Sequence, residues 1–574
     1  MQNNEIAKIF WEIAELLELK EENRFKIHAY QNAARNIENL PHHLDEIYKK
    51  QGLKGLKELE GVGESIAHKI EEYIKHKKVK KHQDLLKEFP KGFLALINIP
   101  GMGPKTAMKL HKELKINSMD DLERAIKKGF LKDLPGFKEK KQENIKKGIE
   151  LKKRSHGRFL ISDADELAQT LTLQLANLKE IKKLTVAGSL RRREETIGDI
   201  DILVISERPK AVMDYFTKLA QVKRILAKGE TKSSVILNND MQADLRVLKP
   251  DEFGSALHYF TGNKQHNIKI RELAIKKGLK VSEYGLFKKD KKIAGRTEEE
   301  LFEALGLNYI PPELRAGEDE LEIAKDKKIP RLIELFDIKG DLQMHSKHSD
   351  GKNPIEEMAE YAKKLGYLYI AITDHSKSQR IAHGQTEREI LKAFKEIDKI
   401  NARIKGLKVL KGVEVDILPD GYLDFKDEIL KECDVVLAAV HSVFKMPQDK
   451  MTKRIIKAMQ NRYVNILAHP TGRLINEREP YNVNVEEMLK AAADTGTFME
   501  INAHPKRLDL KDTHIKMAKE MGILFAINTD SHATFSLENM KFGVSMARRG
   551  WIEKKDVINT LTINKLMKKL YQKR

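Results

Sequence analysis

The sequence predicts a multidomain protein with a helical first part, a mixed α/β middle part and a small parallel barrel at the end. Three observations support this prediction. Apolar residues recur at helical spacing through residues 1–150, short β-branched runs begin near residue 159, and seven strand-like segments alternate with helical ones after residue 337. With 574 residues, the chain has room for about four domains.

The composition excludes several classes of protein. Hydrophobic residues make up 41% of the chain, so global disorder is excluded. No apolar run approaches the roughly 18 residues of a membrane span, and the first residues do not form a signal peptide. Cys433 is the single cysteine, which excludes an internal disulfide framework and a Cys-rich zinc site. We therefore expect a cytoplasmic protein without a membrane partner.

The charge balance favours a polyanionic partner. Lysine and arginine number 106 against 86 acidic residues, and the excess is spread over the whole chain rather than confined to a tail. Nucleic acid is the obvious polyanion for such a surface. Charge alone does not decide the matter, because many basic proteins bind no nucleic acid.

The helical part contains an internal repeat, since residues 56–74 resemble residues 96–114. Each copy places a glycine-x-glycine turn before an amphipathic helix, at Gly61, Val62 and Gly63 and at Gly101, Met102 and Gly103. Such a turn directs backbone N–H groups outward, where they can bind a phosphate without contacting a base. The pair predicts helix-hairpin-helix binding of the DNA backbone, with plain helix packing as the alternative.

Three aspartates stand out in the middle part. Asp199 and Asp201 alternate within one strand-like run and therefore share a face, while Asp244 lies in a neighbouring run. Side-by-side carboxylates repel each other unless a cation offsets their charge, so we expect a site for two Mg²⁺ ions. Gly188, Ser189 and the following arginines would hold a triphosphate beside it. The alternative is acids on a solvent-facing edge strand.

The last part places metal-binding residue types near the ends of its predicted strands, at 337–344, 367–374, 407–415, 434–440, 464–469, 497–503 and 523–530. Barrel enzymes build their sites at this end of their strands. The candidate ligands are His345, Asp350, His375, Glu414, His441, His469, Asp530 and His532.

Residues 188–204 resemble the nucleotidyltransferase signature of family X DNA polymerases, the family of polymerase beta, and residues 258–278 resemble its nucleotide-contacting segment. The resemblance covers residues 1–315. It implies that Asp199, Asp201 and Asp244 bind the catalytic metals, and that Asp244 helps to deprotonate the primer 3′-hydroxyl. It also implies nucleotide contacts by Arg158, Gly188, Ser189, Arg192, Tyr259, Phe260, Gly262, Asn267 and Arg271. Lys264 stands where eukaryotic relatives carry an acid, and we take it as an additional nucleotide contact.

In the first domain, Lys69 aligns with the lysine with which this family forms a Schiff base to remove a 5′-deoxyribose phosphate. Lys26 and Tyr30 match neighbouring phosphate-binding positions. A lysine at position 69 is equally compatible with simple phosphate binding, so lyase chemistry and phosphate binding are both left open.

The last part resembles the polymerase and histidinol phosphatase (PHP) domain, through residues 373–376, 412–417, 438–442, 468–473 and 528–532. The resemblance implies a metal-dependent phosphoesterase that processes 3′ ends and is a 3′→5′ exonuclease. Histidine and carboxylate ligands suit Mn²⁺, Zn²⁺ or Fe²⁺. The family opens with His-x-His, but here Gln343 replaces the first histidine, which predicts incomplete metal binding and weakened exonuclease activity.

We predict six segments from these observations. They are a lyase-like helix-hairpin-helix domain (1–90), a second helix-hairpin-helix domain (91–154), an α/β nucleotidyltransferase palm (155–250), a nucleotide-selecting thumb (251–316), a linker (317–336) and a distorted (β/α)7 PHP barrel (337–574).

The predicted function is gap filling in DNA repair, with gapped or primed duplex DNA and deoxynucleoside triphosphates as substrates. We expect a monomer that uses Mg²⁺, with Mn²⁺ able to substitute, at the polymerase site. Two alternatives are a small-molecule phosphatase of the histidinol phosphatase type fused to a DNA-binding scaffold, and a scaffold with both sites vestigial.

Overall fold

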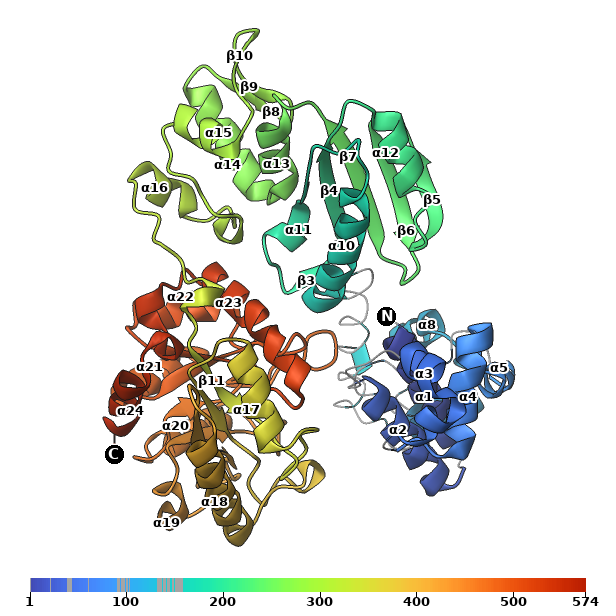
Figure 1. Ribbon diagram of the computed structural model, residues 1–574, viewed down its shortest axis with the longest axis vertical. Helices are drawn as coiled ribbons and strands as arrows, with labels where there is room; N and C mark the ends of the chain where they lie inside the picture. The colour runs from blue at the N-terminus through green and yellow to red at the C-terminus, as the bar shows by residue number, and fades with distance from the viewer. Residues whose placement is uncertain are drawn as a thin grey trace. The chain divides into compact units, whose positions relative to one another are not determined.

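The computed structural model describes residues 2–20, 22–38, 44–59, 61–89, 104–131 and 158–573, with the single positions 93, 96, 99, 102, 137, 141, 145, 146 and 149. The chain divides into two compact units, Met1–His156 and Gly157–Arg574 (Figure 1). None of the helices in these described ranges has the length and apolar character needed to cross a membrane.

The first unit is helical, as predicted. Its helices bury one apolar face each in a common cluster that includes Ile6, Phe10 and Ile13, which is the expected result of apolar residues at 3.6-residue spacing. The described helices are α1 (Gln2–Leu19), α2 (Arg24–Glu38), α3 (Leu44–Lys57), α4 (Glu64–His76), α5 (Lys80–Lys87), α7 (Pro104–Leu114) and α8 (Met119–Lys127).

The second unit begins with the palm, a five-stranded sheet in the order β2-β4-β7-β6-β5. Its strands are β2 (Lys183–Val186), β4 (Asp199–Ile205), β5 (Val222–Lys228), β6 (Lys232–Leu237) and β7 (Gln242–Leu248). Helices α10 (Ile161–Ala176) and α12 (Pro209–Phe216) pack against it (Figure 1). The apolar residues Ile200, Ile202 and Val204 join the core beneath these helices. The alternate residues of β4 are therefore free to form a site on the other face.

The thumb follows the palm and packs around its own apolar cluster, which includes Ile270, Leu301 and Phe302. It is built from α13 (Phe253–Thr261), α14 (Lys264–Lys276), α15 (Glu298–Ala304) and a small sheet in the order β10-β9-β8. The strands of this sheet are β8 (Lys280–Ser282), β9 (Gly285–Lys288) and β10 (Lys291–Ala294).

The segment predicted as a linker is packed against the thumb. It contains α16 (Glu320–Lys325), whose residues Leu321 and Ala324 are buried in the thumb cluster. Glu320 is fully buried and accepts a hydrogen bond from the backbone N–H of Gly317 at 2.8 Å. Its Oε1 also lies 2.8 Å from Nδ1 of His266. The dense charge of this segment predicted an exposed chain. In the structure the Glu320 carboxylate is instead buried and accepts a hydrogen bond from a backbone N–H group.

The last part confirms the predicted barrel. Seven strands pair in parallel in sequence order, and β11 returns toward β17 through the hydrogen bond from His345 N to Ser531 O at 2.8 Å. The strands are β11 (Gly340–Met344), β12 (Tyr369–Ile372), β13 (Lys408–Asp416), β14 (Val435–Ala439), β15 (Ile466–Leu467), β16 (Phe498–Asn502) and β17 (Phe525–Asn528). The helices outside them are α17 (Ile355–Lys364), α18 (Glu387–Arg403), α20 (Gln448–Met459), α21 (Val485–Thr495), α22 (Asp512–Glu520), α23 (Met540–Arg549) and α24 (Ile563–Tyr571).

Two candidate active sites

The palm brings the three predicted aspartates together. Strands β4 and β7 pair in parallel with Asp201 directly opposite Asp244, and Asp199 lies two residues away on the same face. Strand β4 lies between β2 and β7 and is not an edge strand, and Asp244 is only 8% exposed. The alternative of acids on an exposed edge strand does not fit this sheet.

The electrostatics of this cluster favour a bound cation. Burial, the Asp199 charge and the Asp244 charge together raise the pKa of Asp201 to about 7. Burial and then Asp244 also raise the pKa of Asp199. Both raised pKa values mean that the charged form of each carboxyl is disfavoured in the folded protein without a cation. Carboxylate oxygens facing one another in this way form the donor set that Mg²⁺ binds, so these residues fit the metals expected of them.

Gly188 follows strand β2 by two residues, lies against this cluster and is required by its geometry. Its φ is +67°, and a Cβ atom there would lie 2.4 Å from Oδ2 of Asp201. Any other residue would be strained in the backbone and would collide with the carboxylate. The short helix α11 (Gly188–Arg191) therefore begins directly against Asp201, and Ser189 is its second residue.

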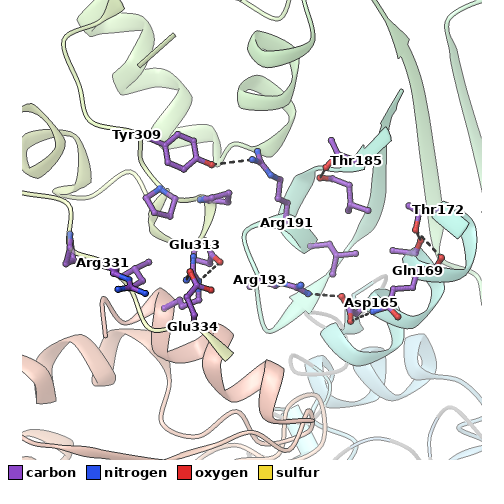
Figure 2. Close-up of a pocket in the computed structure, with 18 residues that line it drawn as sticks. Asp165, Gln169, Thr172, Thr185, Arg191, Arg193, Tyr309, Glu313, Arg331 and Glu334 are labelled. Carbon is purple, nitrogen blue, oxygen red and sulfur yellow. Dashed lines mark hydrogen bonds and ion pairs between the residues drawn. The ribbon is translucent and has the colours of Figure 1, made fainter. Parts of the chain in front are cut away.

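The three consecutive arginines after this turn have different partners. Arg191 pairs with both carboxylate oxygens of Glu298 in the thumb, at 2.9 and 2.6 Å. Arg193 points to Asp165 at 2.7 Å, as Figure 2 shows. Arg192 donates to the carbonyl of Thr261 and, at 3.4 Å, to Oε1 of Glu194, and has no bidentate carboxylate partner among the residues described. The first and third arginines are thus held by short ion pairs within the protein, whereas the ion pair of Arg192 with Glu194 is longer.

The remaining predicted nucleotide contacts surround the start of α14. Asn267 donates to the carbonyl of Tyr259 at 2.8 Å, and Arg271 donates to the carbonyl of Asn267 at 3.3 Å. The Tyr259 and Phe260 rings meet edge to face, with 5.1 Å between their centroids. Gly262 ends α13 with φ of +68°, and Lys264 begins the next helix. Arg158, in the palm, donates to Thr196 Oγ1 at 2.9 Å, and its charge partly offsets the rise in the pKa of Asp199 that burial and Asp244 cause.

A cavity of about 640 Å³ lies close to this site but does not contain it (Figure 2). Its walls come from α10, from the segment around Tyr309 and Glu313, and from Arg548 of the barrel. Arg191 and Arg193, two of the three arginines that follow the Gly188-Ser189 turn, line it, but none of the other predicted site residues does. We therefore place the polymerase site at the carboxylates and not in this cavity.

The barrel brings together all eight predicted metal ligands. They form three overlapping groups in which one ligand atom from each residue lies within 4.8 Å of the others. The groups are His345, Asp350, His375 and His532; His375, Glu414 and His441; and His345, Glu414 and Asp530. His469 completes the cluster, because its Nε2 lies 2.9 Å from Oε1 of Glu414.

Unsatisfied atoms show that this cluster fits metal ions. His345 is fully buried and its Nδ1 has no hydrogen-bond partner in the described structure, while its Nε2 lies 3.2 Å from Oδ1 of Asp530 and 3.3 Å from Oε2 of the buried Glu414. Burial lowers the pKa of His375 to about 3, so its imidazole is neutral and can donate a lone pair to a metal. Buried polar atoms are normally paired, and ions bound at these three groups would provide the missing partners.

Gln343 lies in β11, two residues before His345. It is fully buried, and neither its amide oxygen nor its amide nitrogen has a hydrogen-bond partner in the part of the chain described. The pairing of β11 with β12 shifts register between Asp341 and Met344, so simple alternation does not assign Gln343 a face. The predicted effect of Gln343 on metal binding stays a prediction.

Three further residues of the barrel site were not predicted from the sequence. Asp416 lies 2.5 Å from Nδ1 of His441 and orients that ring. Glu500 accepts a hydrogen bond from the backbone N–H of His469 at 2.6 Å. Arg507 pairs with Asp530 at 3.3 Å. Asp416 could have been found, because it follows Glu414 by two residues in one strand, whereas only the fold places Arg507 here.

In the first unit, Lys69 has an environment compatible with both predicted roles. Its Nζ donates to the carbonyl and hydroxyl oxygens of Ser65 at 2.9 and 2.8 Å and lies 5.8 Å from the centre of the Tyr30 ring. Burial lowers the pKa of Lys69, which makes the free amine more accessible. Lys26 is exposed and pairs with Glu22 at 3.3 Å.

The first hairpin turn has the geometry that its glycines predicted. Gly61 has φ of +73°, and a Cβ atom there would lie 2.5 Å from Nδ2 of Asn36. Val62 is buried, and Gly63 caps the N-terminus of α4 without a side chain to block its N–H groups. In the second turn, Met102 is buried, while Gly101 and Gly103 lie outside the described residues.

Comparison with family models identifies four matching regions. Residues 1–79 match a helix-hairpin-helix domain and residues 93–152 match a SAM-like helix-hairpin-helix tandem. Residues 256–316 match the DNA polymerase beta thumb, and residues 341–504 match the PHP domain. These matches agree with the predicted order of domains along the chain.

Comparison with individual proteins gives a match over nearly the whole length. The chain is 39% identical over 567 residues to the protein named DNA polymerase/3′-5′ exonuclease PolX of Bacillus subtilis (strain 168), covering 98% of each chain. The chain is also 33% identical over 231 residues to a probable phosphatase of Thermoanaerobacter sp. (strain X514), a match that covers 38% of this chain and 89% of that one. On the full-length match and the two sites described above, this chain belongs to the family X DNA polymerases that carry a C-terminal PHP domain.

Proposed function

We propose that this protein fills short gaps in DNA by template-directed nucleotide addition and processes 3′ ends in its PHP barrel. The observation that supports it best is the buried juxtaposition of Asp201 and Asp244, with Asp199 on the same face and Gly188 against the carboxylates. The name of the full-length relative supports the same pair of activities.

In the polymerase reaction, the primer 3′-hydroxyl attacks the α-phosphorus of the incoming nucleotide and pyrophosphate leaves. Two Mg²⁺ ions, for which Mn²⁺ can substitute, would be held by Asp199, Asp201 and Asp244 and would neutralise the charge of the phosphates. Asp244 accepts the proton of the attacking hydroxyl. Ser189 and Arg192 bind the outer phosphates, because the turn at Gly188 lets the backbone approach them.

Residues at the start of the thumb position the nucleotide. Tyr259 and Phe260 pack against the sugar and base, and the close backbone at Gly262 disfavours a 2′-hydroxyl. Asn267 and Arg271, already linked by a hydrogen bond, face the minor groove of the new pair. Such positioning supplies much of the rate enhancement in phosphoryl transfer.

The barrel is proposed to hydrolyse phosphoesters at DNA 3′ ends, as an exonuclease that also acts on abasic sites or 3′-phosphates. Mn²⁺, Zn²⁺ or Fe²⁺ ions would be held by the eight ligands and would activate water for the attack. Asp416 orients the ring of His441, and Glu500 holds the backbone N–H of His469. The cytoplasmic location and the monomeric state stay predictions.

The small-molecule phosphatase alternative explains the barrel alone. Relatives named as probable phosphatases match 38% of this chain or less. An enzyme that hydrolyses a small phosphate ester would need neither a thumb nor helix-hairpin-helix domains. Comparing hydrolysis of histidinol phosphate with removal of nucleotides from a primer end separates the two. Faster turnover of histidinol phosphate would favour the alternative.

The test of the whole proposal is primer extension on a gapped duplex, with Mg²⁺ and separately with Mn²⁺. One labelled primer reports synthesis as longer products and 3′ processing as shorter ones. We expect gap filling with either ion. Failure to extend a primer under both conditions would contradict the polymerase half of the proposal.

DNA binding should respond to a 5′-phosphate and to salt. A short gap with a 5′-phosphate is expected to bind more tightly than an open template-primer, because Lys26, Lys69 and the Gly61 turn offer phosphate-binding groups. The logarithm of the binding constant should fall with the logarithm of the salt concentration by about 0.9 per neutralised phosphate. Fluorescence anisotropy measures both effects. Equal affinity for the two substrates, or a flat salt dependence, would count against this binding mode.

The role of Lys69 can be decided by borohydride trapping on a duplex with a 5′-deoxyribose phosphate end. If Lys69 forms the Schiff base, the covalent product should disappear in Lys69→Ala. Lys75→Ala is the matched control, since Lys75 lies on the same helix but pairs with Glu71 at 2.8 Å. Trapping that persists in Lys69→Ala would remove Lys69 from this role and leave phosphate binding as its function.

A further inference from the structure

Ion pairs join the palm to the barrel within residues 157–574. Arg193 and Lys541 share Asp165, part of which Figure 2 shows. Glu194 and Glu195, which follow the phosphate-binding turn, also face barrel cations. Arg549 pairs with Glu194 at 3.1 Å, and Arg473 pairs with Glu195 at 2.7 Å. The pair between Arg473 and Glu195 is connected to the metal ligands through further contacts of Arg473.

Arg473 holds two loops of the barrel mouth together. It lies four residues after His469 and donates to the backbone carbonyl of Arg507 at 2.9 Å and to that of Leu508. The same loops are joined by Thr471, whose N–H and hydroxyl donate to Asp509 at 2.9 Å each. Arg473 therefore fixes the loop after β16 against the loop that carries His469.

The loop fixed in this way reaches the metal cluster. The Arg507 side chain lies 3.3 Å from Oδ2 of Asp530, and Oδ1 of Asp530 lies 3.2 Å from Nε2 of His345. A displacement of the Arg507 backbone would move its charge relative to Asp530. Groups that orient a metal ligand in this way commonly change metal affinity or activity by about 10- to 100-fold when they are removed.

The pairing of Arg473 depends on Glu195. Arg473 is only 8% exposed, and among the residues described Glu195 is the carboxylate that pairs with its guanidinium. A buried cation without its counter-charge is costly, so the side chain would have to shift. Arg549 is in a different position, because it keeps Asp512 at 2.5 Å when Glu194 is neutralised.

We propose that Glu195, a residue of the palm, is a positioning residue for the PHP active site. By holding Arg473 it fixes Arg507, and through Arg507 it fixes the metal ligand Asp530. The barrel site is therefore completed by the polymerase core. This proposal rests on the proposed phosphoesterase function of the barrel, but its central readout is metal affinity, which does not require that activity.

The experiment uses the full-length chain with Glu195→Gln and, as matched control, Glu194→Gln. Affinity for Mn²⁺ alone is measured by competition with a fluorescent chelator in an Asp201→Asn background, which weakens the palm metal site. The kcat and KM for removal of a 3′-terminal nucleotide are measured without the background change. Arg473→Gln and the double variant Glu195→Gln/Arg473→Gln complete a thermodynamic cycle.

We expect Glu195→Gln to weaken Mn²⁺ binding about tenfold and to lower kcat about tenfold with KM changed less than twofold. Glu194→Gln should leave both quantities within twofold of the parent. The double variant should bind Mn²⁺ no more weakly than Arg473→Gln, because both changes break the same chain of contacts from Glu195 through Arg473 and Arg507 to Asp530. A thermal-stability loss without a change in Mn²⁺ affinity, or equal effects of the two glutamate variants, would overturn the proposal. If the parent removes no nucleotides at all, as an impaired site at Gln343 would also give, Mn²⁺ affinity alone decides the role of Glu195.

Discussion

Replacing Asp199, Asp201 or Asp244 with asparagine is expected to abolish nucleotide addition. Each change removes a charged ligand from a cluster whose repulsion only cations can offset. Metal ions stabilise the phosphoryl-transfer transition state by several kcal/mol, and each ~1.4 kcal/mol is a factor of ten in rate. Loss of one ligand should therefore lower the rate of single-nucleotide addition about a thousand-fold or more, measured by rapid quench on a gapped duplex.

Stability measurements distinguish this result from misfolding. Because the folded pKa of Asp201 is raised from 3.8 to about 7, its carboxyl disfavours the folded metal-free protein increasingly as the pH rises through that interval. Asp201→Asn removes this effect, so its Tm at pH 8 without metal should equal or exceed that of the parent. Asp240→Asn is the matched control, since Asp240 lies in the same sheet region and pairs with Lys223 at 2.6 Å. Near-normal extension by any triad variant would refute the assignment, and 3′ processing should survive in all three.

Replacing Gln343 with histidine is expected to raise the metal content of the barrel and the rate of 3′→5′ exonuclease activity together. A neutral imidazole binds Mn²⁺ or Zn²⁺ well, whereas a glutamine amide is a weak, uncharged ligand. The buried amide of Gln343 also makes no hydrogen bond in the described structure that its replacement would break. The parent should therefore hold metal below the full complement and show weak or absent exonuclease activity. Metal analysis and a labelled-primer assay measure the two quantities.

Two controls make the Gln343 result specific. Gln343→Asn keeps an amide and should not raise metal content, and nucleotide addition should be unchanged in both variants because that site lies in the palm. The alternative is that Gln343 is tolerated and the remaining eight ligands suffice. If neither metal content nor exonuclease rate rises in Gln343→His, this residue does not limit the domain.

The local patterns in the sequence were sufficient to predict the fold of each part, and the candidate residues of the two sites lie close together as their spacing predicted. Alternation in β4 predicted that Asp199 and Asp201 share a face, and the structure shows Ile200 and Ile202 in the core on the other side. Recurring ligands after successive strands predicted one cluster, because parallel strands of a barrel end on the same rim. The linker was harder to predict, since its sparse apolar residues did not reveal that Glu320 would be buried.

The sequence by itself determined the order of domains, the secondary structure and which residue types could bind metals, because these depend on short-range periodicity and on side-chain chemistry. Only the tertiary structure decided which arginine side chains pair with which carboxylates. Arg191, Arg192 and Arg193 are adjacent in sequence, yet the first and third are paired with Glu298 and Asp165. The contact between Glu195 and Arg473 spans 278 positions. No local pattern encodes such a pair, because its partners meet only when separately folded layers pack against each other.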